Sequence, residues 1–209
     1  MTAPRRALVL IDVQQEYFDG PLSIQYPPRD ESLANILRAL DTATRADMPV
    51  VALRHQSPEG FPVFAAGTPG WELHPEVERR LGPTTKRVTK NFSDIFTATG
   101  LAEWFRENGI DTLTLVGYMT NNCVLSTSAA AEPLGLTVEV LSDATGAVHL
   151  SNEAGTASAQ QVHETLMTLL HSNWAAVTTT DKWSSAVTDG DRLTKSDLVT
   201  SALQGLATH

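Results

Sequence analysis

Cysteine is nearly absent from this chain: only one of its 209 residues is Cys, so no intramolecular disulfide can form. This excludes the small disulfide-stapled scaffolds. Positive charge is also scarce, because 15 Lys and Arg stand against 24 Asp and Glu, which gives a net charge of −9. A field of that sign repels phosphate backbones and anionic lipid headgroups, so we expect neither nucleic acid nor a membrane as a partner.

Long apolar runs are missing as well. No stretch approaches the roughly 18 consecutive apolar residues of a membrane-spanning helix, and the run over 7–11 stops at Asp12, short of a signal-peptide core. We therefore expect a cytoplasmic protein whose thiol stays reduced. With 42% hydrophobic and 19% charged residues, the composition is that of a globular protein, and the length suits one domain over 1–209.

Apolar runs of strand length alternate with segments of helical periodicity. The run over 7–13 is typical of a strand buried on both faces, and the spacing over 32–46 predicts an amphipathic helix with Ser32 as its N-cap. Further strands are expected at 50–53, 87–89, 112–116, 137–141 and 175–178, and further helices at 101–108, 123–134 and 153–171. This alternation predicts an α/β fold with a doubly wound, mainly parallel six-stranded sheet and helices on both faces. An extension over 187–209 is predicted to contain one helix, at about 196–206.

Three reactive side chains, Asp12, Lys90 and Cys123, each follow a different predicted strand. Ligands of doubly wound sheets bind beyond the carboxyl ends of the strands, so an acid, an ammonium and a thiol should meet there. Taken alone, each residue also has an ordinary structural interpretation. Asp12 could be a helix cap, Lys90 a surface charge and Cys123 a small buried side chain. A helix start and Lys90 near Cys123 both favour a thiolate, which predicts faster labelling by iodoacetamide than for an ordinary thiol.

Three motifs surround these residues: ALVLIDVQQEYF contains Asp12, KNFSDIFTATGL begins at Lys90, and LVGYMTNNCVLSTSAAAEPLGLTVEVLSDAT contains Cys123. In this order and spacing they resemble the isochorismatase-like cysteine hydrolase superfamily, over about 7–183. The resemblance implies a Rossmann-like three-layer α/β/α fold and a catalytic triad of Asp12, Lys90 and Cys123. It also implies a cis peptide between Met119 and Thr120, with the amides of Thr120 and Cys123 facing a developing oxyanion.

The triad predicts a hydrolase of C–N bonds other than peptide bonds. In this interpretation Asp12 accepts the thiol proton, and the Cys123 thiolate attacks a small carboxamide, carbamoyl or ureido compound to form a thioester. Two alternatives stay open. An isochorismatase-type enzyme would hydrolyse a vinyl ether with Asp12 and without the thiol, and a non-catalytic protein would use the same fold for small-molecule binding or thiol redox sensing.

Metal-binding relatives carry an Asp-x-His element after the second strand, whereas residues 53–55 read Leu-Arg-His here. One histidine offers too few ligands for a cation, so we predict no metal and no cofactor; lone histidines such as His163 are interpreted as structural. The resemblance also implies a homo-oligomer, a dimer or a tetramer, in which the apolar face of the C-terminal helix is covered. For the small-molecule substrate, the candidate contacts are polar and aromatic residues flanking the site: Gln14, Phe18, Trp71, Phe96, Tyr118 and Asn121.

Overall fold

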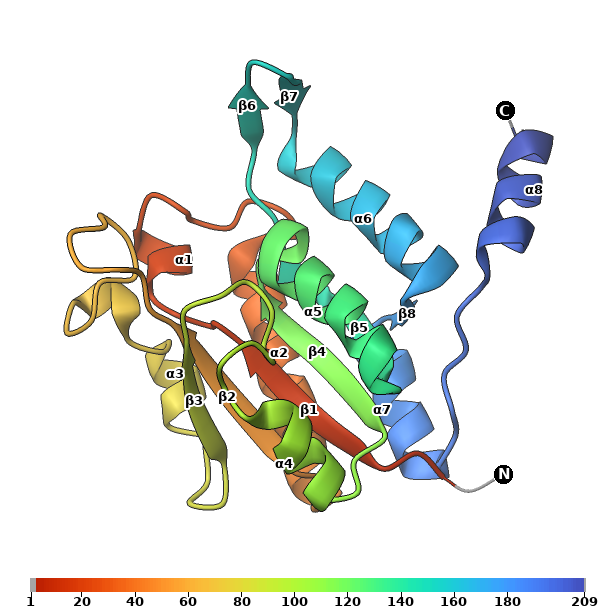
Figure 1. Ribbon diagram of the computed structural model, residues 1–209, viewed down its shortest axis with the longest axis horizontal. Helices are drawn as coiled ribbons and strands as arrows, with labels where there is room; N and C mark the ends of the chain where they lie inside the picture. Colours follow the sequence, from red (N-terminus) through yellow and green to blue (C-terminus); the bar gives the residue numbers. More distant parts are fainter. Residues whose placement is uncertain (1–2, 209) are drawn as a thin grey trace.

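The computed structural model describes residues 3–208. Six parallel strands form one sheet in the order β3-β2-β1-β4-β5-β8, which confirms the predicted doubly wound architecture (Figure 1). The chain moves outward from β1 through β2 to β3 and then returns to place β4 on the other side of β1, so the strand order switches between β1 and β4. The bounds of the strands are β1 Arg6–Ile11, β2 Val50–His55, β3 Lys86–Lys90, β4 Thr112–Tyr118, β5 Thr137–Gly146 and β8 Ala175–Thr178.

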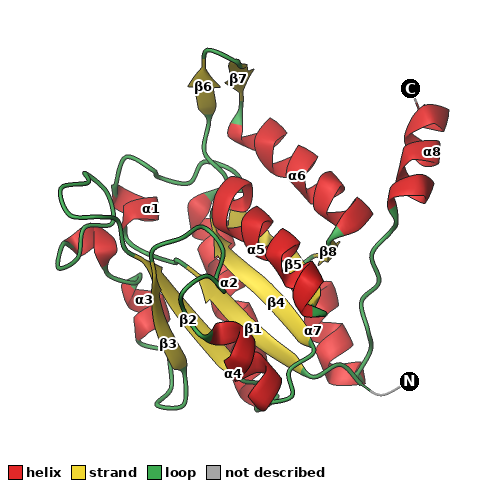
Figure 2. Ribbon diagram, in the orientation of Figure 1, coloured by secondary structure: helices red, strands yellow, loops and turns green. Residues whose placement is uncertain are grey.

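Helices cover both faces of the sheet (Figure 2). One face is covered by α4 (Leu101–Glu107), α5 (Leu125–Ala131) and α6 (Ala159–Asn173), and the other by α2 (Arg29–Arg45), α3 (Pro75–Glu78) and α7 (Thr180–Asp189). A hydrophobic core lies on each face of the sheet, and alternate residues of β1 pack into the two cores. Val9 lies on the α4–α6 side, and Leu8 and Leu10 lie on the α2–α7 side. Burial on both faces explains why the strand sequences read as continuous apolar runs.

Two helix starts differ from the prediction. The helix expected from residue 153 begins at Ala159, because Ser158 and Gln161 form a capping box there, and the residues before it form the antiparallel hairpin of β6 (Leu150–Asn152) and β7 (Gly155–Ala157). α2 begins at Arg29 rather than at Ser32. Ser32 is therefore not the N-cap: its buried hydroxyl lies 2.6 Å from the Tyr118 hydroxyl.

The helix predicted at about 196–206 corresponds to α8 (Leu198–Thr208). The preceding helix, α7, was not predicted, and it ends at Asp189, inside the extension. In Figure 1, α8 stands off from the sheet beyond α6. None of its residues is buried, and it exposes four large apolar side chains: Leu198, Val199, Leu203 and Leu206. His209, the last residue of the predicted extension, lies outside the described residues. Among residues 3–208, no helix has both the length and the apolar character needed to cross a bilayer.

A buried polar network joins β1, β4, β5 and α7. Its centre is Glu139 on β5, which is 1% exposed and accepts hydrogen bonds from Arg6 at 2.8 Å, Thr114 at 2.9 Å and the Trp183 indole at 3.1 Å. The side chain of Arg6 is 4% exposed, so the ion pair is removed from water. Such a pair does not by itself stabilise a fold strongly, but removing one partner leaves an uncompensated buried charge.

We expect Glu139→Gln to lower the free energy of unfolding by about 3–5 kcal/mol, because Arg6 keeps its charge and loses its counter-ion. Urea denaturation followed by circular dichroism measures the change. The matched control is Glu103→Gln, which removes an exposed carboxylate paired with Arg106 on α4 and should leave stability nearly unchanged. Equal stabilities for the two variants would contradict the prediction.

Candidate active site

The strands that precede Asp12 and Cys123 meet closely at the carboxyl edge of the sheet. Ile11, at the end of β1, pairs with Gly117 on β4. Gly117 has a φ of +103°, and a Cβ there would lie 2.1 Å from the Ile11 carbonyl oxygen. Only glycine permits this approach, which holds the two strand ends together beside the switch point.

The structure brings Asp12, Lys90 and Cys123 together at this edge. The ammonium of Lys90 lies 2.7 Å from Asp12 Oδ2 and 3.3 Å from Cys123 Sγ, and it donates a hydrogen bond to the Phe92 carbonyl at 3.1 Å. Asp12 and Lys90 have no exposed side-chain surface, and Cys123 is 3% exposed. An acid, a base and a thiol therefore share a site from which bulk water is excluded, while their catalytic roles stay predictions.

Asp12 is held in an unusual backbone conformation. Its φ is +50°, in the left-handed region that few residues other than glycine adopt. Its N–H donates to the Leu53 carbonyl at 3.2 Å and its own carbonyl accepts from Gln14 at 2.7 Å. The contact with Lys90 is an ion pair, and within the described part of the chain neither carboxylate oxygen accepts a hydrogen bond of good geometry. One oxygen is thus available for a further proton.

Burial raises the pKa of Cys123 to about 12, and the charge of Asp12 acts in the same direction against the opposing effect of Lys90. Burial alone would lower the pKa of Lys90, but Asp12 and Cys123 outweigh it, so that pKa is raised and the side chain stays an ammonium. The raised pKa of Cys123 favours a thiol over the thiolate that the helix start and Lys90 predict, because the sulfur is desolvated and lies in the π-helical turn Thr120–Val124 before the short α5. The ionisation of Cys123 stays a prediction.

We now expect iodoacetamide to label Cys123 slowly at about pH 7.5 and faster as the pH rises toward about 12, because only the thiolate is alkylated. The chain has one cysteine, so the mass of the intact protein reports this residue alone. The same chain unfolded in guanidinium is the control, with an ordinary thiol pKa of about 8.5. If the labelling rate of the folded chain stops rising at about pH 8.5, as in the unfolded control, burial does not raise the pKa of Cys123.

The cis peptide lies one residue earlier than predicted. It joins Tyr118 to Met119, and the predicted bond between Met119 and Thr120 is trans. Thr120 already begins the helical turn, whereas Tyr118 is the last residue of β4, so the chain changes direction before Met119. The N–H of Met119 donates to no described residue. It therefore joins Thr120 and Cys123 as a candidate oxyanion donor that the motif alone did not identify.

Three of the six predicted substrate contacts belong to the folded scaffold. Gln14 is fully buried: its amide donates to the carbonyls of His55 and Trp71 at 2.9 and 2.7 Å and accepts from the His55 N–H at 2.8 Å. Tyr118 has no exposed surface and bonds to a hydroxyl of α2. Phe18 packs edge-on against Tyr118. Their burial and partners give these three residues a structural role, and their contact with substrate stays a prediction.

For the other three the prediction stays open as well. Trp71 is partly buried, and the Arg54 guanidinium lies 3.8 Å from its ring centroid. Asn121 lies in the turn of Cys123. Among the residues that the structure describes, the Trp71 indole N–H has no acceptor and the buried Oδ1 of Asn121 has no donor. Phe96 packs edge-on to Phe105 in the core of the α4–α6 face. Unpaired polar atoms of this kind are available to a bound ligand.

His55, which the sequence predicted to be a lone histidine with too few ligands for a metal, is a neighbour of the triad. Gln14 holds its backbone from both sides, and the strand register pairs it with Lys90. Its Nδ1 is buried, with no hydrogen-bond partner among residues 3–208. Burial, followed by the charge of Lys90, lowers the pKa of His55 against the opposing effect of Asp12, so the ring is neutral beside the site.

Within residues 3–208 no group of three or more His, Cys, Asp and Glu side chains is arranged to hold a metal ion. Leu53, at the position of the carboxylate in metal-binding relatives, is fully buried in the core. The predicted lack of a metal and of any cofactor stays a prediction.

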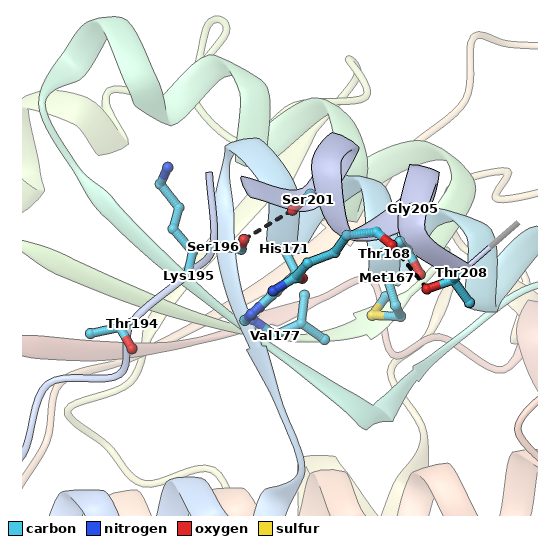
Figure 3. A pocket seen from close by; sticks show the side chains of 11 residues that line it. Met167, Thr168, His171, Val177, Thr194, Lys195, Ser196, Ser201, Gly205 and Thr208 are labelled. Carbon is cyan, nitrogen blue, oxygen red and sulfur yellow. Dashed lines mark hydrogen bonds between the residues drawn. The ribbon is translucent and has the colours of Figure 1, made fainter. Parts of the chain in front are cut away.

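A large groove lies away from these residues, between α6 and α8 (Figure 3). It has a volume of about 790 Å³ and is lined by side chains that include Met167, His171, Lys195 and Ser201. It lies beside β8, at the sheet edge opposite the one formed by β3, which carries Lys90. This groove therefore does not give access to the triad.

Comparison with known proteins identifies the family. The family model for the Isochorismatase domain matches residues 6–182. This chain belongs to the isochorismatase family. The match confirms the family that the three motifs predicted, and with it a hydrolase.

Relatives within the isochorismatase family share the fold closely. A crystal structure of a candidate isochorismatase from Burkholderia xenovorans LB400 is 46% identical, with a TM-score of 0.96, and the alignment covers 99% of each chain. A secreted isochorismatase effector of Verticillium dahliae is 35% identical over 66% of this chain and 71% of its own. A streptothricin hydrolase of Streptomyces noursei is 33% identical over 68% of this chain and 54% of its own length.

Proposed function

We propose that this isochorismatase-family protein is a thiol hydrolase of small carboxamide, carbamoyl or ureido compounds, with Cys123 as nucleophile. The observation that carries the proposal is the contact of one buried ammonium, Lys90, with both the Asp12 carboxylate at 2.7 Å and the Cys123 sulfur at 3.3 Å. A nucleophile, a base and a positive charge in a buried site are the parts that acyl transfer requires.

The first half of the reaction forms a thioester. Asp12, whose Oδ1 has no hydrogen-bond partner among the described residues, takes the proton of the Cys123 thiol as the sulfur attacks the carbonyl carbon of the substrate. The amides of Thr120 and Cys123, with the unpaired amide of Met119, stabilise the oxyanion. The C–N bond then breaks, and Asp12 returns the proton to the leaving nitrogen, which departs as ammonia or an amine.

The second half releases the acid. Water enters the place of the leaving group and gives a proton to Asp12 as its oxygen attacks the thioester carbon. The C–S bond breaks, and the proton passes from Asp12 to the sulfur, which restores the thiol of Cys123. Throughout, the Lys90 ammonium balances the negative charge that moves between Asp12 and the sulfur.

The surroundings of Cys123 favour a small substrate. The sulfur belongs to a residue that is 3% exposed, and Asn121 in the same turn has a buried Oδ1 without a partner among the described residues. This oxygen can accept a hydrogen bond from the N–H of a primary amide or a ureido group. The same burial, with a thiol pKa of about 12, argues against the redox-sensor alternative, because sensor thiols are exposed and easily ionised.

A panel of substrates tests the proposal. Ammonia release is measured from nicotinamide, a carbamoylated amino acid, ureidoacrylate, biuret and maleamate. Hydrolysis of streptothricin, suggested by the Streptomyces noursei relative, is followed by the mass of one added water. We expect turnover of at least one compound by the native chain and none by Cys123→Ala. Turnover by none of the compounds, or equal turnover by both proteins, would overturn the proposal.

We also propose that the protein is a homo-oligomer in which a second copy covers α8. No residue of α8 is charged, and four of its large apolar side chains are 61–79% exposed. The Burkholderia xenovorans chain aligns over 99% of this one, so it includes this helix. Light scattering of the native chain and of the double variant Leu203→Glu/Leu206→Glu tests the idea, which a monomeric native chain would contradict.

A further inference from the structure

One hydrogen bond joins the turn of Cys123 to α6. Thr120, the first residue of the π-helical turn Thr120–Val124, places its hydroxyl 2.9 Å from Nδ1 of His163. Thr120 is fully buried and His163 is 3% exposed, so water is not at hand to replace either partner. The two residues are 43 positions apart in the sequence, and sequence patterns alone led us to interpret His163 as structural.

The surroundings of the His163 ring keep it neutral. In its hydrogen bond with Thr120, either the hydroxyl or Nδ1 can be the donor, according to the tautomer of the ring. Burial lowers the pKa of His163, which keeps the ring neutral, and Tyr26 packs edge-on against it with its hydroxyl held by Glu164 at 2.9 Å.

The turn is anchored at two points. Within the described part of the chain, only two of its five residues make side-chain hydrogen bonds to other elements: Thr120 bonds to His163, and Cys123 accepts from Lys90. The two residues that anchor the turn through their side chains, Thr120 and Cys123, thus also carry the backbone amides that would face an oxyanion. A turn released at Thr120 can move these amides relative to the sulfur, and a displacement of about 1 Å costs about 100-fold in rate.

We propose that His163 is a positioning residue, which fixes the turn of Cys123 through Thr120 so that the nucleophile and the oxyanion donors keep their relative geometry. The proposal rests on the proposed function for its effect on turnover. Its effect on the turn itself does not depend on any substrate. His163 touches no reacting atom, so its removal should change the rate constant of the chemical step and spare the binding of substrate.

Kinetics of matched variants test the effect on turnover, with the best compound of the panel as substrate. We expect His163→Leu and Thr120→Val each to lower kcat by about 10- to 100-fold with KM within about twofold, and the double variant to be no slower than either, because both remove the same hydrogen bond. His163→Gln, whose amide can bond to the Thr120 hydroxyl, should recover part of the rate. The control is His171→Leu on the same helix, whose Nδ1 accepts from Val177 instead of from the turn, and it should keep the native kcat.

Hydrogen–deuterium exchange tests the effect on the turn without a substrate. Peptides covering 118–125 should exchange faster in His163→Leu and Thr120→Val than in the native chain and in His171→Leu. If exchange and kcat are unchanged in both variants, or if KM rises while kcat is constant, the proposal is overturned. If the native chain hydrolyses nothing, the proposed function fails, and the exchange result alone decides whether His163 anchors the turn. Thr120→Val removes only the hydroxyl, so it serves if His163→Leu does not fold.

Discussion

Cys123→Ala should reduce hydrolysis by at least about 10⁴-fold, because removing a covalent nucleophile costs more than removing any group that assists it. In free energy this corresponds to about 5.5 kcal/mol of lost transition-state stabilisation. The expectation depends on the thiol being the attacking atom, which the contact with Lys90 at 3.3 Å supports. Single-turnover and steady-state rates with the best compound of the panel measure the change.

The variant also separates the chemical alternatives. A vinyl ether hydrolase of the isochorismatase type needs Asp12 and not the thiol, so it would keep its rate in Cys123→Ala and lose it in Asp12→Asn. A thiol hydrolase loses its rate in both. Cys123→Ser is the matched control for packing, since it keeps a small polar side chain at a position that is 3% exposed. Near-native turnover in Cys123→Ala would exclude acyl transfer through the sulfur.

The meeting of Asp12, Lys90 and Cys123 could be predicted because each residue lies at or after the carboxyl end of a strand. A buried parallel strand reads as an apolar run, and the polar residue that follows it stands at the ligand edge. Asp12 and Cys123 satisfy this rule on adjacent strands, and Lys90 reaches them from the end of the outer strand β3. Periodicity and topology were sufficient for this much, before any distance was known.

The ionisation of the site could not be predicted from the same pattern. Position near a helix start favours a thiolate, but burial of the sulfur raises its pKa to about 12. Which effect dominates depends on how completely the loops exclude water, and that is a tertiary property. The hydrogen bond between Thr120 and His163 could not be predicted either. The two residues are 43 positions apart, and no local sequence pattern indicates that they are in contact.

The substrate contacts were predicted from closeness to the triad in the sequence, which does not show which side chains the core uses. Phe18 and Tyr118 belong to the core of the α2–α7 face. Gln14 is used by the scaffold to hold the end of β2. The start of α6 was predicted wrongly, although the sequence contains a signal for it. Ser158 and Gln161 have the spacing of a capping box, which marks the observed start.

Lys90→Met should have a second large effect, on turnover and on stability together. The variant keeps the length of the side chain and removes the ammonium that contacts Asp12, Cys123 and the Phe92 carbonyl. Asp12 then stands as a buried carboxylate with no counter-ion, which either takes up a proton or destabilises the fold by about 3–5 kcal/mol. A protonated Asp12 cannot accept the thiol proton, so kcat should fall by about 10³-fold or more while KM changes little.

Lys86→Met is the matched control, because Lys86 begins the strand that Lys90 ends and is partly exposed. It should keep both the rate and the urea midpoint of the native chain. The alkylation rate of Cys123 gives an independent measure: Lys90 lowers the pKa of the thiol against burial and Asp12, so its loss should slow labelling further at every pH below about 12. If Lys90→Met labels as fast as the native chain and retains its kcat, the ammonium does not act on the sulfur, and the shared contact on which the mechanism depends has no chemical role.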